Sequence, residues 1–185
     1  MADPDRADYT HPVGAALAGT LLGVGLYVEA FEGVVFVLRL AVQDHRKVGN
    51  SQVRGVPDDL LDPRTSAAKT IAGCRVSLVA ASVLTEAEFS FLQEARIRRN
   101  TIVHDALRRA FLGPDLVEVR TDVERLITVA RRLEAWQRTA WPAPPPGEAR
   151  TAIAFSELLQ SSLAVSLTLA DAQLSNRASA DPSAA

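Results

Sequence analysis

The stretch that decides the fold is FLQEARIRRNTIVHDALRRA, residues 91–110, in which apolar residues recur at helical spacing. When Arg99 is set at zero and each residue advances by about 100°, several apolar side chains fall within roughly 60° of it. They are Leu92, Ala95, Ile102, Val103, Ala106 and Ala110. The pattern predicts an amphipathic helix over about 86–112, with Arg99 in the middle of its apolar stripe.

An arginine in such a stripe needs a partner. Because arginine keeps its proton in proteins, a place in a packed seam is costly unless an anion or dense hydrogen bonding meets the guanidinium. Glu29 and Glu32 lie in an apolar stretch earlier in the chain, and Arg39 belongs to the same stretch. In one interpretation Arg99 forms a buried structural ion pair with one of these glutamates, and His104 only hydrogen-bonds a backbone carbonyl.

A functional interpretation competes with this structural one. Asn100, His104 and Arg108 follow each other at i, i+4 spacing, on a polar shoulder that begins where the apolar stripe ends. If Arg99 and His104 line a cleft, Arg99 supplies fixed positive charge. Histidine is the side chain suited to proton transfer near neutral pH. Both interpretations stay open on these residues alone.

Helical periodicity dominates the rest of the chain, so the sequence predicts an all-α bundle of about five helices with a long first helix. The expected helices span 12–49, 65–83, 86–112, 122–140 and 149–175. Capping boxes are expected at Thr85 with Glu88 and at Thr121 with Glu124. The loop at 50–65 has room for one helical turn at its DDLL stretch, and Gly113-Pro114 and the proline-rich segment 141–147 break the other helices.

The first helix is predicted to bury one arc of side chains. The arc consists of Leu17, Leu21, Val24, Val28, Phe31, Val35 and Val42. We expect a single domain over 10–176, with polar tails at 1–9 and 177–185, and we expect the last helix to pack on its own bundle rather than on a second chain.

Composition limits the possible functions. The chain has 185 residues and a formal net charge of −2, so any binding of nucleic acid depends on a local basic patch rather than on a global field. Cys74 is the only cysteine, which excludes an internal disulfide and fits a cytoplasmic protein. His11 and His45 lack metal-spaced partners, and no glycine-rich phosphate loop or nucleophile elbow occurs. We therefore expect no metal and no cofactor.

Residues 9–28, YTHPVGAALAGTLLGVGLYV, carry no Asp, Glu, Lys or Arg over about the length that a bilayer requires. Glycine, threonine, histidine and proline dilute the apolar character of this segment, and the residues before it are acidic rather than basic. We expect no membrane contact. A membrane-associated helical protein anchored by 9–28 is the less favoured alternative.

The hexamer RNTIVH, from Arg99 to His104, resembles the motif of the HEPN superfamily of small helical-bundle proteins. That motif consists of an arginine, a polar residue that is Asn, His or Asp, three further residues and a histidine. The stretch YVEAFEGVVFVLRLAV, residues 27–42, is also similar to the first helix of several prokaryotic members. The resemblance covers about residues 12–140, with 149–175 as an additional helix.

The resemblance implies a metal-independent endoribonuclease that works as a homodimer, with the two motifs facing each other across the two-fold interface. His104 is then the general acid or base, Arg99 stabilises charge on the phosphate, and Asn100 orients one of them. A dimer seam also fits the geometry, because a step of five residues separates Arg99 and His104 by about 140° on one helix. The expected products are a 2′,3′-cyclic phosphate and a 5′-OH.

The family's wider properties carry over in part. A role as a toxin or defence protein is expected, together with an antitoxin or another regulatory protein as a partner. Arg96, Arg98, Arg108 and Arg109 either attract RNA phosphates or form an ordinary solvated basic face. Ala106 stands where toxins paired with a nucleotidyltransferase antitoxin usually have tyrosine, so regulation by adenylylation does not carry over. The alternative is a catalytically inactive HEPN-like dimer that serves as a scaffold or interaction module.

Overall fold

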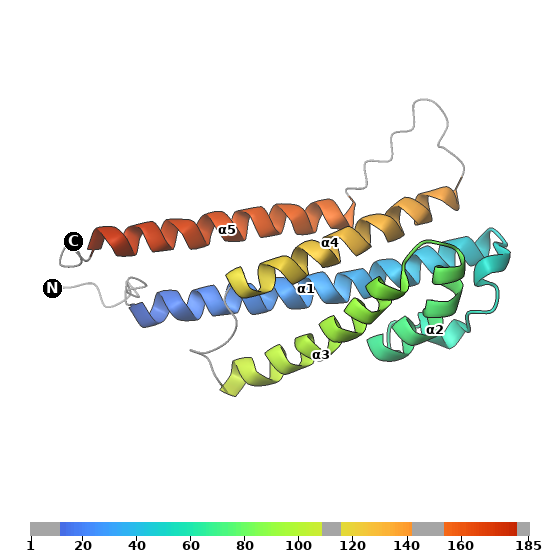
Figure 1. Cartoon of the computed structure of the whole chain (residues 1–185), viewed down its shortest axis with the longest axis horizontal. Helices are drawn as coiled ribbons and strands as arrows, with labels where there is room; N and C mark the ends of the chain where they lie inside the picture. Colours follow the sequence, from blue (N-terminus) through green and yellow to red (C-terminus); the bar gives the residue numbers. More distant parts are fainter. Residues whose placement is uncertain (1–11, 109–115, 142–153, 181–185) are drawn as a thin grey trace, which may run out of the picture.

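The computed structural model describes residues 12–108, 116–141 and 154–180, with side chains within 20–104, 119–141 and 154–169. It is an all-α bundle of five helices, as the sequence predicts, and the described residues contain no strand. The helices are α1 (Pro12–Lys47), α2 (Ala67–Ala80), α3 (Glu86–Arg108), α4 (Leu116–Thr139) and α5 (Phe155–Ala180). In Figure 1 the long α1 runs through the centre of the bundle, and α2 lies beside its C-terminal end.

The core is built around α1, which packs against each of the other four helices. Phe31, Val35 and Val42 of the predicted arc are buried, but Leu21 is 58% exposed and that part of the prediction is wrong. Since α1 has neighbours on several sides, it also buries residues outside a single arc. These additional residues include Tyr27, Ala30, Val34, Leu38 and Ala41. Leu17 lies outside the described side chains.

Local signals in the sequence fix the ends of the first three helices. Gly49 has a φ of +77° just after α1, and Asn50 N donates to His45 O at 2.9 Å, which closes the helix as a Schellman motif. Ser66 is the N-cap of α2. The predicted capping box of α3 is confirmed, because Thr85 N donates to Glu88 Oε2 at 2.7 Å and Glu88 N to Thr85 Oγ1 at 3.2 Å.

The start of α4 differs from the prediction. The helix begins at Leu116, so Thr121 lies inside it and is not an N-cap. Val119 and Val123 are both fully buried and are four residues apart, so burial of one helix face extends α4 upstream of the proposed cap. Glu124 accepts a hydrogen bond from Arg120 Nε at 2.8 Å instead of closing a capping box. The predicted helix end at Gly113-Pro114 lies outside the described residues.

The last helix, α5, is joined to α4 by a carboxylate. Glu134 is buried and accepts from Ser156 N at 3.0 Å and from Ser156 Oγ at 2.6 Å, so it caps the N-terminus of α5. A Cβ on Gly33 of α1 would lie 1.7 Å from the Phe155 ring, so only glycine allows this contact. The helix therefore begins later than predicted and continues to Ala180, into the predicted tail, while packing on α4 and α1 of its own chain.

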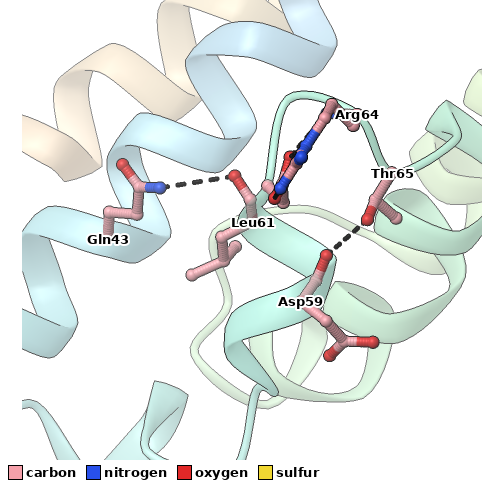
Figure 2. A network of polar contacts seen from close by, with 6 residues as sticks. Gln43, Asp59, Leu61, Arg64 and Thr65 are labelled. Carbon is pink, nitrogen blue, oxygen red and sulfur yellow. Dashed lines mark hydrogen bonds and ion pairs between the residues drawn. The ribbon is translucent and has the colours of Figure 1, made fainter.

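Hydrogen bonds from side chains to backbone carbonyls hold the 50–65 loop. It contains two 3₁₀ turns, η1 (Ser51–Val53) and η2 (Asp58–Leu61), and the second is the predicted DDLL turn. Figure 2 shows Gln43 of α1 donating to the Leu61 carbonyl at 3.4 Å and the Thr65 hydroxyl donating to the Asp59 carbonyl. The second contact fixes the chain just before α2.

His45 has a structural role that the sequence did not indicate. Its ring is buried and stacks on Trp136 of α4, with ring centroids 3.7 Å apart. Nε2 lies 2.8 Å from the Trp136 carbonyl, which only accepts hydrogen bonds, and Nδ1 lies 2.9 Å from Asn50 Nδ2. These partners assign the neutral ring with its proton on Nε2.

One described helix passes a test of length and composition for crossing a membrane. It is α1, in which the stretch Thr20–Lys47 contains an 18-residue window with a mean hydropathy of 1.9, and half of this window is buried inside the bundle. Core helices of soluble proteins pass the same test.

Candidate functional site

Helix α3 packs one side against α1, and Arg99 of the motif lies on that side. Leu92, Ala95 and Ile102 of the predicted stripe are buried, and Tyr27 of α1 donates to the Ala95 carbonyl at 3.3 Å. Arg99 lies between these residues, but its side chain is 31% exposed. It therefore lies at the edge of the packed seam rather than inside it, and the sequence overestimated its burial.

Arg99 is held by two neighbours. Its Nη2 lies 2.7 Å from Glu32 Oε1 of α1, and its Nη1 donates to Asn100 Oδ1 at 3.2 Å. Glu32, not Glu29, is thus the partner among the described residues. The Glu32 side chain is 48% exposed, and an ion pair as open as this contributes about 0–1 kcal/mol. The Nε of Arg99 is buried and has no described hydrogen-bond partner.

His104 lies apart from this cluster. Its side chain is exposed, and it is absent from the described residues that line the pocket beside Arg99. The structure thus brings together Arg99, Asn100 and Glu32 and leaves the histidine facing solvent. An exposed imidazole on α3 is accessible to a nucleic acid or to another protein chain.

The four arginines predicted to bind RNA have different environments. Arg98 lies 3.0 Å from Asp122 of α4, with its guanidinium 6.0 Å from the Tyr27 ring centroid. Burial raises the pKa of Tyr27, and the charge of Asp122 adds to this increase. Arg96 donates from Nε to Gln93 Oε1 at 3.2 Å. The side chain of Arg108 and the whole of Arg109 lie outside the described residues.

A polar pocket of about 300 Å³ opens beside Arg99, between α1, α3 and the start of α2. Its described lining consists of Phe31, Glu32, Arg39, Pro63, Thr65, Ser66, Ala67, Ala68, Arg96, Arg99 and Asn100. Arg39 was a candidate for an ion pair, yet its described hydrogen bonds go from Nη2 to the Thr65 carbonyl at 2.5 Å and to Thr70 Oγ1 at 3.1 Å. Arg39, Arg96 and Arg99 thus line the same pocket.

A larger pocket of about 530 Å³ lies away from the motif, between the C-terminal end of α1 and the 50–65 loop. Arg46 and Asp58 form an ion pair in its wall. Asp62 also lines it, and hydrogen bonds from the Arg64 side chain and backbone lower the pKa of this carboxyl to about 2. Its described lining contains no residue of the motif.

No local pattern in the sequence places Arg39 and Ser66 near Arg99. Ser66 is recognisable as an N-cap, because it precedes an apolar helical segment, but its position opposite α3 depends on tertiary packing. Within the described residues, no group of three or more His, Cys, Asp or Glu side chains could hold a metal ion. Comparison with family models, curated proteins and solved structures finds no significant match.

Proposed function

We propose that this protein is a metal-independent endoribonuclease of the HEPN type, active as a homodimer. The observation that carries the proposal is the placement of Arg99 and Asn100 at the wall of a polar pocket, with the motif's histidine exposed further along α3. A guanidinium is suited to a phosphate oxygen, because its planar N–H groups match phosphate geometry.

In the proposed reaction, the RNA 2′-oxygen attacks the adjacent phosphorus and the bond from phosphorus to the 5′-oxygen breaks. One His104 accepts the proton of the 2′-OH, and the His104 of the second copy donates a proton to the leaving 5′-oxygen. Arg99 stabilises the charge that develops on the phosphate. The products are a 2′,3′-cyclic phosphate and a 5′-OH, and no step needs a metal ion. Cleavage of cellular RNA fits a toxin or defence protein under the control of a regulatory partner.

A catalytically inactive HEPN-like scaffold is the second candidate, and the Arg99–Glu32 ion pair favours it. A structural pair within one chain is the arrangement that an inactive member is expected to keep. The exposure of both side chains limits this argument, because a pair worth about 0–1 kcal/mol can be broken by a phosphate that binds the guanidinium.

Purified full-length wild type, Arg99→Ala and His104→Ala should be incubated with total RNA in the presence of EDTA. Cleavage by the wild type alone, with 2′,3′-cyclic phosphate ends, supports the enzyme. Arg75→Ala, which removes another exposed arginine that pairs with a glutamate, Glu86, is the control and should cleave like the wild type. If none of the proteins cleaves RNA, the result favours the scaffold. If all of them cleave RNA equally, the result reveals a contaminating nuclease.

A further inference from the structure

The pocket beside Arg99 has an excess of positive charge. Arg39 of α1 and Arg96 of α3 line it together with Arg99, and Glu32 is the one acidic residue among its described lining. The described lining therefore contains three guanidinium groups and one carboxylate, which pairs with Arg99. Such an excess within about 300 Å³ is suited to an anion larger than one carboxylate group.

The N-terminus of α2 opens into the same pocket. Ala67 and Ala68 line it, and the first turn of the helix contains no acidic residue. The first N–H groups of a helix have no intrahelical partner and carry partial positive charge, so they attract anions. The Ser66 side chain satisfies Lys69 N, which leaves the amides of the two alanines nearest the pocket.

Hydrogen bonds fix the pocket wall. Arg39 holds the Thr65 carbonyl and the Thr70 hydroxyl, and Thr70 Oγ1 in turn donates to the Leu60 carbonyl at 2.9 Å. Figure 2 shows the Thr65 side chain held by the Asp59 carbonyl. Because these contacts within the chain already order the wall, binding costs little further ordering.

The pocket is also short of hydrogen-bond acceptors. The Nε atoms of Arg39 and Arg99 are both buried, and neither has a described hydrogen-bond partner. Buried donors in folded proteins are nearly always satisfied, so two unsatisfied guanidinium nitrogens beside one polar pocket are unusual. Both arginines line the pocket, so acceptor oxygens placed there lie beside guanidinium groups that are not fully satisfied.

We propose that this pocket binds a phosphate monoester, held by Arg39, Arg96 and Arg99 and by the first amides of α2. A monoester presents three terminal oxygens and a charge of about −1.5 to −2. An internal phosphodiester offers two free oxygens and one charge, which satisfies fewer of the donors. The site goes beyond the proposed cleavage of RNA and does not depend on it, since a monoester has no internucleotide bond to break.

Glu32 acts as the competitor of the ligand. It occupies one nitrogen of Arg99, and its negative charge repels a phosphate in the same pocket. The ion pair is exposed and weak, so a ligand with two charges displaces it. Removal of the carboxylate charge should therefore strengthen binding, whereas loss of a guanidinium should weaken it.

The test is isothermal titration of the full-length chain in EDTA with inorganic phosphate, adenosine 5′-monophosphate and adenosine. We expect the monophosphate to bind and adenosine not to bind. Glu32→Gln should bind the monophosphate about tenfold more tightly than the wild type, and Arg96→Ala about tenfold more weakly. Arg75→Ala, which removes an arginine outside this pocket, should match the wild type. Circular dichroism confirms that each variant is folded.

The three probes also identify the source of the phosphate. Equal affinity for inorganic phosphate and the monophosphate assigns the site to free phosphate, and tighter binding of the monophosphate assigns it to a phosphorylated nucleotide. The proposal is overturned if adenosine binds as tightly as the monophosphate, if Arg96→Ala keeps the affinity of the wild type, or if Glu32→Gln binds neither phosphate probe. These outcomes concern binding alone and are independent of any RNA cleavage result.

Discussion

Arg99 Nη2 lies 2.7 Å from Glu32 Oε1, and this ion pair connects the motif helix α3 to the central helix α1. Both side chains remain substantially exposed. The pair therefore orients the arginine more than it stabilises the bundle. Glu32 also separates the two proposed functions. In a scaffold its carboxylate stays on Arg99, whereas in the enzyme the RNA phosphate takes the place of that carboxylate.

The first prediction concerns the energy of this pair. Replacement of Glu32 by glutamine should lower the free energy of unfolding by less than about 1 kcal/mol. A double-mutant cycle with Arg99→Gln, measured by urea denaturation, should give a coupling energy of about 0.2–1 kcal/mol. A coupling energy above about 3 kcal/mol is typical of a buried pair and would favour the structural scaffold.

The second prediction concerns the C-terminal end of α2. Ser82 has a φ of +55°, while Val83 N donates to the Leu78 carbonyl at 3.0 Å and Ser82 N to the Val79 carbonyl at 2.9 Å. This is a Schellman motif with serine in the position that favours glycine. Ser82→Gly should stabilise the protein by about 0.5–1 kcal/mol, because glycine adopts this conformation without strain.

A matched control exists at the end of α1. Gly49 occupies the equivalent position with a φ of +77°, so Gly49→Ala should destabilise by about 1 kcal/mol or more. Thermal unfolding of both variants measures the two effects. Shifts of the same sign in the two variants would contradict this account of the caps.

The third prediction concerns the attachment of α5. Glu134 accepts two hydrogen bonds from Ser156, so Glu134→Ala leaves this buried serine at the start of α5 without its partner. We expect a loss of about 1–3 kcal/mol in the free energy of unfolding. Glu124→Ala removes an exposed carboxylate from α4, the helix that also carries Glu134, and should lower the free energy of unfolding by less than about 1 kcal/mol. Equal effects of the two substitutions would argue against the cap.

The sequence predicted the helices better than their contacts. Periodicity and the Thr85–Glu88 box located α3, because these signals are local in the chain. Thr121 had the same local signal, but burial of Val119 and Val123 overrode it. The pairing of Arg99 with Glu32 is one of the alternatives that the sequence supports. The sequence does not predict that Arg39 lines the same pocket as Arg99, because a cluster built from separate helices depends on how those helices pack.

The fourth prediction concerns Cys74, which is fully buried on α2. Burial raises the pKa of its thiol from 9.0 to about 11. Since the thiolate is the reactive form, the native protein should react with thiol reagents at pH 8 far more slowly than the protein unfolded in guanidinium. Rapid stoichiometric labelling of the native chain would contradict this burial.

The same shift has a consequence for stability. A pKa that is higher in the folded state means that the fold favours the neutral thiol. This contribution is fully present below pH 9 and is lost as the pH rises towards 11. Cys74→Ala should therefore lose less stability than the wild type between pH 9 and 11, when both are measured by urea denaturation.

The fifth prediction contrasts two histidines of the chain. His45 is buried between Trp136 and Asn50, whereas His104 is exposed on α3. His45→Phe keeps an aromatic ring for stacking but removes the Nε2 donor to the Trp136 carbonyl and the Nδ1 acceptor for the Asn50 amide. It should lower the free energy of unfolding by about 1–3 kcal/mol. His104→Ala should change it by less than about 0.5 kcal/mol, because surface substitutions rarely do more.

This comparison also decides how the RNA assay is read. If His104→Ala keeps the stability of the wild type in urea, loss of cleavage in that variant reports on the imidazole and not on unfolding. A His104→Ala variant as unstable as His45→Phe would show that the imidazole is part of the fold, and His104 would then have to be withdrawn as the proton-transfer residue.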